Sequence, residues 1–123
     1  MNAPENLLYS QSHEWICFCG DRAKVGLSDF AQHALGDIVF VNLPETGTPV
    51  SVGETAGDVE SVKAVSDIYS PLAGVITAVN EELLDAPEKV NADPYGAWLF
   101  EVGDITDKAE LMDADAYAAF CKA

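Results

Sequence analysis

Short runs of β-preferring residues, separated by turn residues, are the feature that most limits how this 123-residue chain can fold. The runs at 13–19, 37–43 and 74–80 carry the aromatic and β-branched side chains or the alternating polarity of strands. We count seven or eight such short strands, with helices only at the margins. The pattern predicts a single mainly-β domain over residues 1–123, built as a flattened barrel or sandwich.

Two helical regions are expected at the edges of this β fold. Ser28 suits the N-cap of a short helix over 29–35, which Gly36 would end. A C-terminal helical region is expected over about 106–121, because this stretch is rich in alanine and follows a last strand at 97–103.

The charge of the chain limits its partners. With 21 acidic and 6 basic residues the formal net charge is −15, so clustered cations for nucleic acid or for an anionic membrane surface are not expected. No apolar run approaches the roughly 20 residues that a membrane span needs. We therefore expect neither a nucleic-acid nor a membrane partner, and fast association with electropositive proteins.

The first residues and the cysteines bear on the compartment. The opening "MNAPENLL" lacks the cations of a signal or transit peptide, which favours a cytoplasmic location, or a mitochondrial matrix location for a processed form. Three unevenly spaced cysteines favour reduced thiols. Cys17 and Cys19 could form half of a metal site with His13, but no second ligand pair has zinc-like spacing. We expect two small buried side chains and no metal.

A single lysine stands out in the middle of the chain. From Val25 to Glu88 there are eleven acidic residues and one lysine, Lys63. The residues around it predict a hairpin over about 55–70, with Lys63 and Ala64 as its two turn residues.

The predicted hairpin breaks two local rules. In this register Glu60 lies opposite Asp67, and like charges weaken strand pairing. The turn also lacks the Gly or Asn that two-residue hairpin turns prefer. The inward face would consist of Val59, Ser61, Ser66 and Ile68. Broken local rules often mark a functional site.

An exposed amine on a stiff support suits the covalent attachment of a swinging cofactor, because the protein's part is then to present the arm. An ordinary solvated lysine is the alternative that the pattern alone leaves open. A Schiff-base enzyme needs a lysine that loses its charge easily, whereas carboxylates around a tip favour the charged form. The pattern therefore favours a carrier over a lysine-nucleophile enzyme.

Four segments together resemble one known family. "SHEW", "AQHALGDIVFVNLPETG", "ESVKAVSDIYSPLAG" and "VNADPYGAWL" are similar, in this order, to the H proteins of the glycine cleavage system, from about Tyr9 to Phe120. The resemblance implies the barrel-sandwich hybrid fold of lipoyl and biotinyl carriers. It also implies lipoic acid in amide linkage on Lys63, and a carrier that is not itself an enzyme.

The same resemblance implies partner enzymes. A pyridoxal-phosphate-dependent glycine decarboxylase would load the aminomethyl group of glycine, and a tetrahydrofolate-dependent aminomethyltransferase would remove it. Dihydrolipoamide dehydrogenase, with FAD, would then reoxidise the dithiol. A lipoyl-attaching enzyme is a further expected partner, and a monomeric state is expected. The residues expected to be recognised beside the lysine are Glu60, Ser61, Val62 and Ala64.

The resemblance also implies a resting place for the arm. Ser12, Glu14 and Asp67 match family positions that hold the loaded amine, which fits the attraction of a protonated amine to carboxylates. His33 matches a segment that borders the arm's cleft, although a helix-surface histidine with local hydrogen bonds is the alternative.

Two other carrier functions remain open at this point. A lipoyl relay, from which lipoyl groups pass to other proteins, needs the same hairpin. A biotinyl carrier shares the fold but usually flanks its lysine with methionines. Here Val62 and Ala64 flank Lys63, and neither Met1 nor Met112 is near it in sequence.

Overall fold

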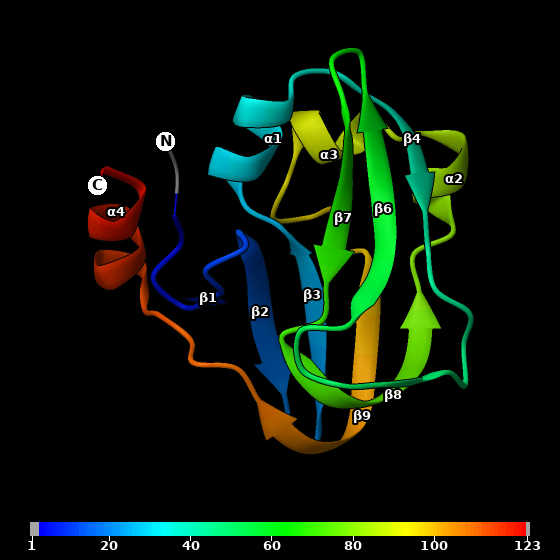
Figure 1. Ribbon diagram of the computed structural model, residues 1–123, viewed down its shortest axis with the longest axis vertical. Coiled ribbons are helices and arrows are strands. Elements are labelled where there is room, and N and C mark those ends of the chain that lie inside the picture. Colours follow the sequence, from blue (N-terminus) through cyan, green and yellow to red (C-terminus); the bar gives the residue numbers. More distant parts are fainter. Residues whose placement is uncertain (1–2, 123) are drawn as a thin grey trace.

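The computed structural model describes residues 3–122 as two antiparallel β-sheets with short helices around them (Figure 1). The strands are β1 (Leu8–Tyr9), β2 (Glu14–Cys19), β3 (Arg22–Leu27), β4 (Ile38–Asn42), β5 (Pro49–Val50), β6 (Thr55–Ser61), β7 (Val65–Tyr69), β8 (Leu72–Val79) and β9 (Phe100–Lys108). The helices are α1 (Asp29–Leu35), α2 (Glu82–Asp85), α3 (Lys89–Ala92) and α4 (Ala114–Lys122). The predicted mainly-β fold is confirmed, and the described strands form no closed barrel. Met1, Asn2 and Ala123 of the predicted domain lie outside the described residues.

The two sheets share one hydrophobic core. The larger sheet has six strands in the order β1-β2-β3-β9-β8-β5, and the smaller has three in the order β4-β6-β7. The most deeply buried aliphatic side chains, 0–1% exposed, come from both sheets and include Val25, Val59, Ile68, Leu72, Ile76 and Val102. Burial of such a side chain is worth roughly 1.5–3 kcal/mol, so this core is what holds the two sheets together.

Helix α1 forms as its local sequence predicts. The Ser28 Oγ accepts a hydrogen bond from the Ala31 N–H at 3.2 Å, which caps the first turn. Gly36 ends the helix with φ +81° and ψ −160°, a backbone conformation that residues with a Cβ rarely adopt. The predicted helix at 29–35 and both of its ends are confirmed.

The predicted start of the C-terminal helical region is wrong. Residues 106–108 belong to β9, and the helix of this region, α4, begins only at Ala114. The reason is a long-range pairing, because Lys108 lies opposite Leu72 and Asp107 opposite Ala73 at the start of β8. A local sequence cannot show that partner strand.

Close backbone contact lets β8 and β9 bend while they stay paired. A Cβ on Gly74 would lie 2.3 Å from the Gly103 carbonyl oxygen, so this approach requires glycine. The register shifts between Ala73 and Val75 at the same place. The two glycines allow β9 to continue past the point at which the sequence predicted its end.

A second apolar cluster covers the outer face of the six-stranded sheet. Tyr9 and Tyr117 stack with ring centroids 4.5 Å apart, which ties α4 to β1. Trp15 packs so closely on its cross-strand partner Gly26 that a Cβ there would lie 2.5 Å from the indole ring. Half-buried Trp98 completes this face beneath the Lys24 ammonium, which lies 4.7 Å from the centroid of its ring.

The cysteines of β2 differ from the expectation. Cys17 is partly buried and packs against the second apolar cluster, but Cys19 is exposed, so the prediction of two buried thiols is wrong for Cys19. Cys19 is the last residue of β2 and is not among the residues that pack against that cluster. The His13 Nδ1 is hydrogen-bonded to the Tyr117 hydroxyl at 2.7 Å. In residues 3–122 no three His, Cys, Asp or Glu side chains are grouped to hold a metal ion.

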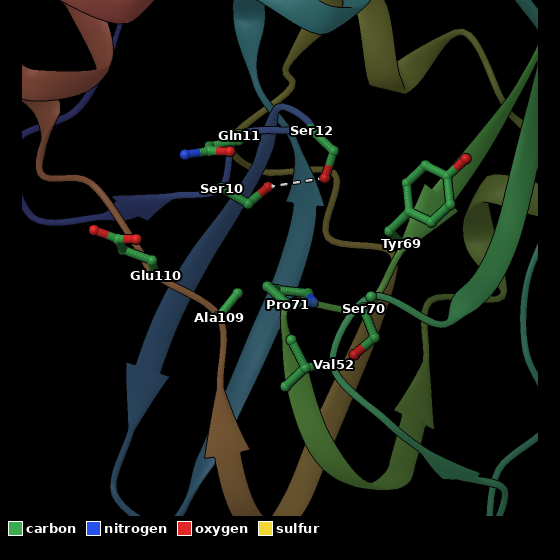
Figure 2. Close-up of a pocket in the computed structure, with 10 residues that line it drawn as sticks. Ser10, Gln11, Ser12, Val52, Tyr69, Ser70, Pro71, Ala109 and Glu110 are labelled. Atoms are coloured by element: carbon green, nitrogen blue, oxygen red, sulfur yellow. Dashed lines mark hydrogen bonds between the residues drawn. The ribbon is translucent and has the colours of Figure 1, made fainter.

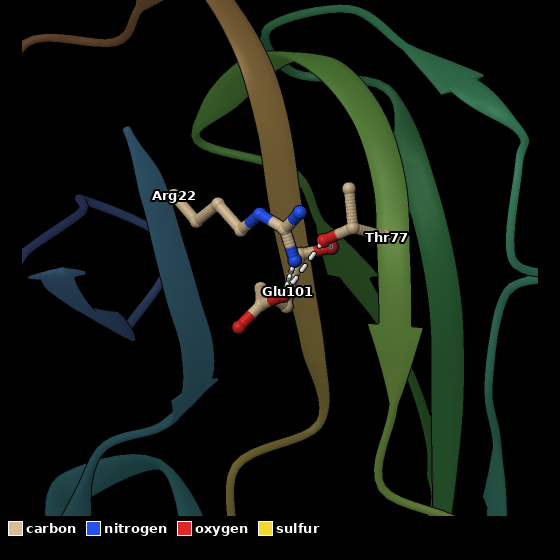
Figure 3. A network of polar contacts seen from close by, with 3 residues as sticks. All are labelled: Arg22, Thr77 and Glu101. Atoms are coloured by element: carbon tan, nitrogen blue, oxygen red, sulfur yellow. Dashed lines mark hydrogen bonds and ion pairs between the residues drawn. The ribbon is translucent and has the colours of Figure 1, made fainter. Parts of the chain in front are cut away.

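A polar network lies on the same outer face of the larger sheet. Figure 3 shows Glu101 of β9 between Thr77 of β8 and Arg22 of β3. The Glu101 Oε1 accepts a hydrogen bond from the Thr77 Oγ1 at 2.8 Å and from the Arg22 Nη1 at 3.4 Å.

Within the described chain, no helix is both long and apolar enough to cross a membrane.

Candidate functional site

The loop that joins β6 to β7 lies at the top of the molecule in Figure 1. Lys63 is the middle residue of this loop. The three loop residues 62–64 are all exposed. Behind them, Val59 of β6 and Ile68 of β7 are 0% and 1% exposed and anchor the hairpin in the core. The predicted placement of Lys63 in the exposed turn region of a hairpin is confirmed.

The predicted register of this hairpin is wrong by two residues. Asp58 pairs with Asp67, and Glu60 pairs with Val65 rather than with Asp67. Because a shift of two residues preserves the alternation of side chains, the predicted faces still hold. Val59 and Ile68 point inward, and the acidic side chains point outward.

The hydrogen bonds of Ser61 explain both the observed register of the hairpin and why its loop contains neither Gly nor Asn. Its Oγ accepts hydrogen bonds from the backbone N–H groups of Lys63 and Ala64, each at 3.1 Å. Its own N–H donates to the Ala64 carbonyl at 2.8 Å. The serine side chain thus closes a longer loop than the predicted two-residue turn, so no residue with positive φ is needed.

The tip also rests on the junction between α1 and β4. The Val62 N–H donates to the Asp37 carbonyl at 3.0 Å. The Lys63 side chain extends across Gly36, where an added Cβ would lie 3.3 Å from the lysine Cε. Gly36 therefore leaves room for the stem of the lysine as well as ending α1.

Asn91 of α3 holds this junction in place, a role that the sequence did not predict. Its Nδ2 donates to the Gly36 carbonyl and to the Gln32 Oε1, both at 2.9 Å. Its Oδ1 accepts from the Ile38 N–H at 2.8 Å. These partners lie 53–59 residues away in the chain, so no local signal could have found them.

A hollow of about 440 Å³ opens at the opposite end of β7 from the lysine. Figure 2 shows Ser10 and Ser12 side by side on one wall, with Tyr69, Ser70 and Pro71 across from them. Ser12, which was predicted to hold the arm, lines this hollow together with Ser10, which was not predicted.

Glu14 lies behind the two serine hydroxyls and is only 1% exposed. Its Oε1 accepts hydrogen bonds from the Ser10 Oγ at 2.7 Å and the Ser12 Oγ at 2.5 Å. The Tyr69 N–H approaches its Oε2 at 3.5 Å. Burial raises the pKa of the Glu14 carboxyl, and these hydrogen bonds oppose the rise.

The other two predicted arm residues lie elsewhere. Asp67 is exposed on the outward face of β7, two residues before Tyr69. His33 is exposed on α1, the helix that Gly36 ends beside the Lys63 side chain. Neither is among the residues that line the hollow, and their roles stay predictions.

Comparison with known proteins decides the family. A profile described as "Glycine cleavage H-protein" matches residues 7–123. The chain belongs to this family.

Close relatives agree over nearly the whole length. The glycine cleavage system H protein of Lachnoclostridium phytofermentans is 52% identical over 99% of this chain and 97% of its own. That of Burkholderia cenocepacia is 54% identical over 95% of each chain. The crystal structure of a glycine cleavage system H protein from Mycobacterium marinum matches with a TM-score of 0.89 and 44% identity, over 94% of this chain and 96% of that one.

These matches confirm the family that the sequence resembled and the fold that the resemblance implied. As a member of the family, the chain is a carrier protein of the glycine cleavage system.

Proposed function

We propose that Lys63 carries lipoic acid in amide linkage, and that the arm takes the aminomethyl group of glycine from a pyridoxal-phosphate-dependent decarboxylase to a tetrahydrofolate-dependent aminomethyltransferase. Dihydrolipoamide dehydrogenase then restores the oxidised arm, and the chain itself performs no catalysis. The observation that carries the proposal is the exposed lysine on a loop that Ser61, Asp37 and Gly36 hold in place. When attached, the lipoyl group supplies a disulfide that can be reduced and reoxidised.

The residues around Lys63 fit such a group. Its amine is exposed, as an enzyme that acylates it requires, while the backbone on both sides is hydrogen-bonded. A fixed backbone lowers the entropy that is lost when a partner takes up the arm. The chain's own contribution is therefore to present the arm in one place.

The hollow at Ser10 and Ser12 fits an amine at the far end of the arm. Both hydroxyls already donate to Glu14, so their oxygens can only accept from an incoming donor. The Ser10 oxygen already accepts from the Glu14 N–H at 3.0 Å, which leaves the Ser12 oxygen as the more available acceptor. An ammonium group there would favour the charged form of the Glu14 carboxyl, against the effect of burial. Asp67 would add a second carboxylate along β7. The hollow would thus shield the carried group from water until the next partner arrives.

The attachment residue can be tested directly. Protein from a lipoate-replete host should gain the mass of one lipoyl group, and peptide digestion should place it on Lys63. Lys63→Arg should fold normally, because the tip is exposed, and should abolish glycine decarboxylation in a reconstituted system. Lys89→Arg is the matched control and should retain activity. A lipoyl group found only on Lys24 or Lys89 would disprove the assignment.

The resting place can be tested on lipoylated protein. Glu14→Ala and Asp67→Ala should shorten the lifetime of the carried group, because a charge-assisted hydrogen bond is worth roughly 1.5–3 kcal/mol. We expect the larger effect from Glu14, since it is buried and Asp67 is exposed. Glu81→Ala, at an exposed acid just before α2, is the control. Unchanged lifetimes in both variants would show that these residues do not form the resting place.

A further inference from the structure

Apolar side chains gather on the outer face of the three-stranded sheet, beside the lysine. Val39 and Phe40 of β4 are 54% and 49% exposed, and Val62 and Val65 next to the tip are 67% and 63% exposed. We call these four residues the tip patch. Exposed apolar side chains that gather at one place on a soluble protein can mark a site of interaction.

The strand register places two residues of the tip patch, Phe40 and Val65, on the same outward face. Phe40 lies opposite Glu60, and Glu60 lies opposite Val65, so the three side chains form one outward row across β4, β6 and β7. The Val62 N–H bonds to Asp37, which brings the loop against the start of β4. Cross-strand neighbours on one face lie about 5 Å apart, so Phe40 and Val65 flank the acidic Glu60 in this row.

A β-bulge is the reason why two consecutive residues of β4 face solvent. The register shifts between Ile38 and Phe40, while Ile38 and Val41 are each only 3% exposed. Without the bulge, strict alternation would turn Val39 or Phe40 toward the core. Bulges are frequent next to functional sites, where they redirect a side chain.

The charge on this face indicates the kind of partner. Asp58, Glu60 and Asp67 point outward from the same two strands. A second copy of this chain, at −15, would bring acids against acids, which costs affinity. The surface that fits the tip patch is an apolar hollow with a basic rim.

We propose that the tip patch is the docking surface for the enzyme that forms the amide on Lys63. This inference rests on the proposed function. Such an enzyme must take the lysine Nζ into its own active site, so its surface necessarily contacts the residues around the tip. Enzymes that act on the far end of an attached arm have no such requirement. The apolar contact supplies affinity, and the acids orient the approach.

The reaction that this docking serves is an acyl transfer. The ammonium of Lys63 first gives up one proton, and the neutral Nζ attacks the carbonyl carbon of an activated carboxylic acid, such as an acyl adenylate. The C–N bond forms, the C–O bond to the leaving phosphate group breaks, and the nitrogen loses a second proton. No oxidant or reductant is needed.

The test uses unmodified protein, a purified lipoate–protein ligase, lipoate and ATP. Phe40→Ser should lower kcat/KM for modification of Lys63 about tenfold, through a higher KM, because a central apolar anchor of an interface is lost. Phe18→Ser is the matched control, since Phe18 is 42% exposed on β2 of the other sheet. We expect it to change kcat/KM less than twofold. Phe40→Leu, which keeps an apolar side chain, should retain most of the wild-type kcat/KM.

Val62→Ser guards against a folding defect, because Val62 lies in the loop and outside both strands. It should also raise KM severalfold. Wild-type rates for both Phe40→Ser and Val62→Ser would overturn the proposal.

The partners can then be separated on protein lipoylated to completion. A Phe40→Ser variant that is lipoylated normally, but is slow only with glycine decarboxylase, would assign the patch to that enzyme and overturn our choice. If the wild type gains no lipoyl group on Lys63, the proposed function itself fails.

Discussion

The outer faces of the two sheets differ in what covers them. On the six-stranded sheet, Trp15 lies against Gly26, and the stacked rings of Tyr9 and Tyr117 join α4 to β1. On the three-stranded sheet, Phe40 and Val65 stay about half to two-thirds exposed. One face is thus partly covered by β1 and α4, near the two ends of the chain, and the other is open beside Lys63.

The difference shows two uses of apolar side chains in one small domain. Covered aromatic residues add to stability, because their area is removed from water and their polar atoms find partners. The Tyr117 hydroxyl, for example, is hydrogen-bonded to His13 and to Ser28. Exposed apolar residues add little to the stability of the monomer, which is why we propose a docking role for those beside Lys63.

The largest effect is expected where the covered face is broken. Tyr117→Ala should lower the free energy of unfolding by about 3–5 kcal/mol, the usual cost of truncating a buried aromatic residue. Tyr69→Ala, at a tyrosine that is 39% exposed, should cost about 1 kcal/mol or less. Urea unfolding of both variants measures the difference. Equal losses would show that the two faces do not differ in this way.

A somewhat smaller loss is expected at the support of the open face. Asn91→Ala should cost about 2–3 kcal/mol, because Gly36, Gln32 and Ile38 lose their hydrogen-bond partner. Asn42→Ala is the control, since Asn42 makes an exposed hydrogen bond to Asp58. It should cost less than about 1 kcal/mol. Chemical denaturation checks both values, and similar losses would argue against Asn91 as the support of the tip.

The glycine beneath the lysine sharpens the comparison further. Gly36→Ala should cost about 1–2 kcal/mol, from its positive φ and from contact with the Lys63 stem. Gly20→Ala shares the positive φ, at +65°, but a Cβ there would meet no atom within 4 Å. It should cost less, and only Gly36→Ala should alter the rate at which a small acylating reagent modifies Lys63. Identical acylation rates for Gly36→Ala and the wild type would exclude a contact between residue 36 and the Lys63 side chain.

The smallest effect is a pH dependence at Glu14, where β2 approaches β7. Burial raises its pKa above the value in the unfolded chain, so the folded state binds this proton more tightly. The stabilisation that comes from this tighter proton binding is complete at low pH. It is lost as the pH rises from about 4 through the raised pKa of Glu14. The wild type should therefore lose stability relative to Glu14→Gln over this range. Urea midpoints of the wild type and of Glu14→Gln at several pH values measure this loss, and midpoints that run parallel over this range would contradict it.

Features that depend on neighbouring residues could be predicted from the sequence. Helix α1 and its ends follow from Ser28 and Gly36, whose capping bonds reach only a few residues. The inward and outward faces of the hairpin, and Lys63 at its tip, follow from the period of two in a strand. The family motifs added Ser12 and Glu14, which do lie together.

Features that depend on distant partners could not be predicted. The register of the hairpin depends on the Ser61 bonds and on contact with Asp37, and the end of β9 depends on pairing with β8. The exposure of Phe40 depends on a bulge against β6. Local sequence states which residues prefer a strand, but the free energy that selects a register comes from contacts formed only after the sheets have packed.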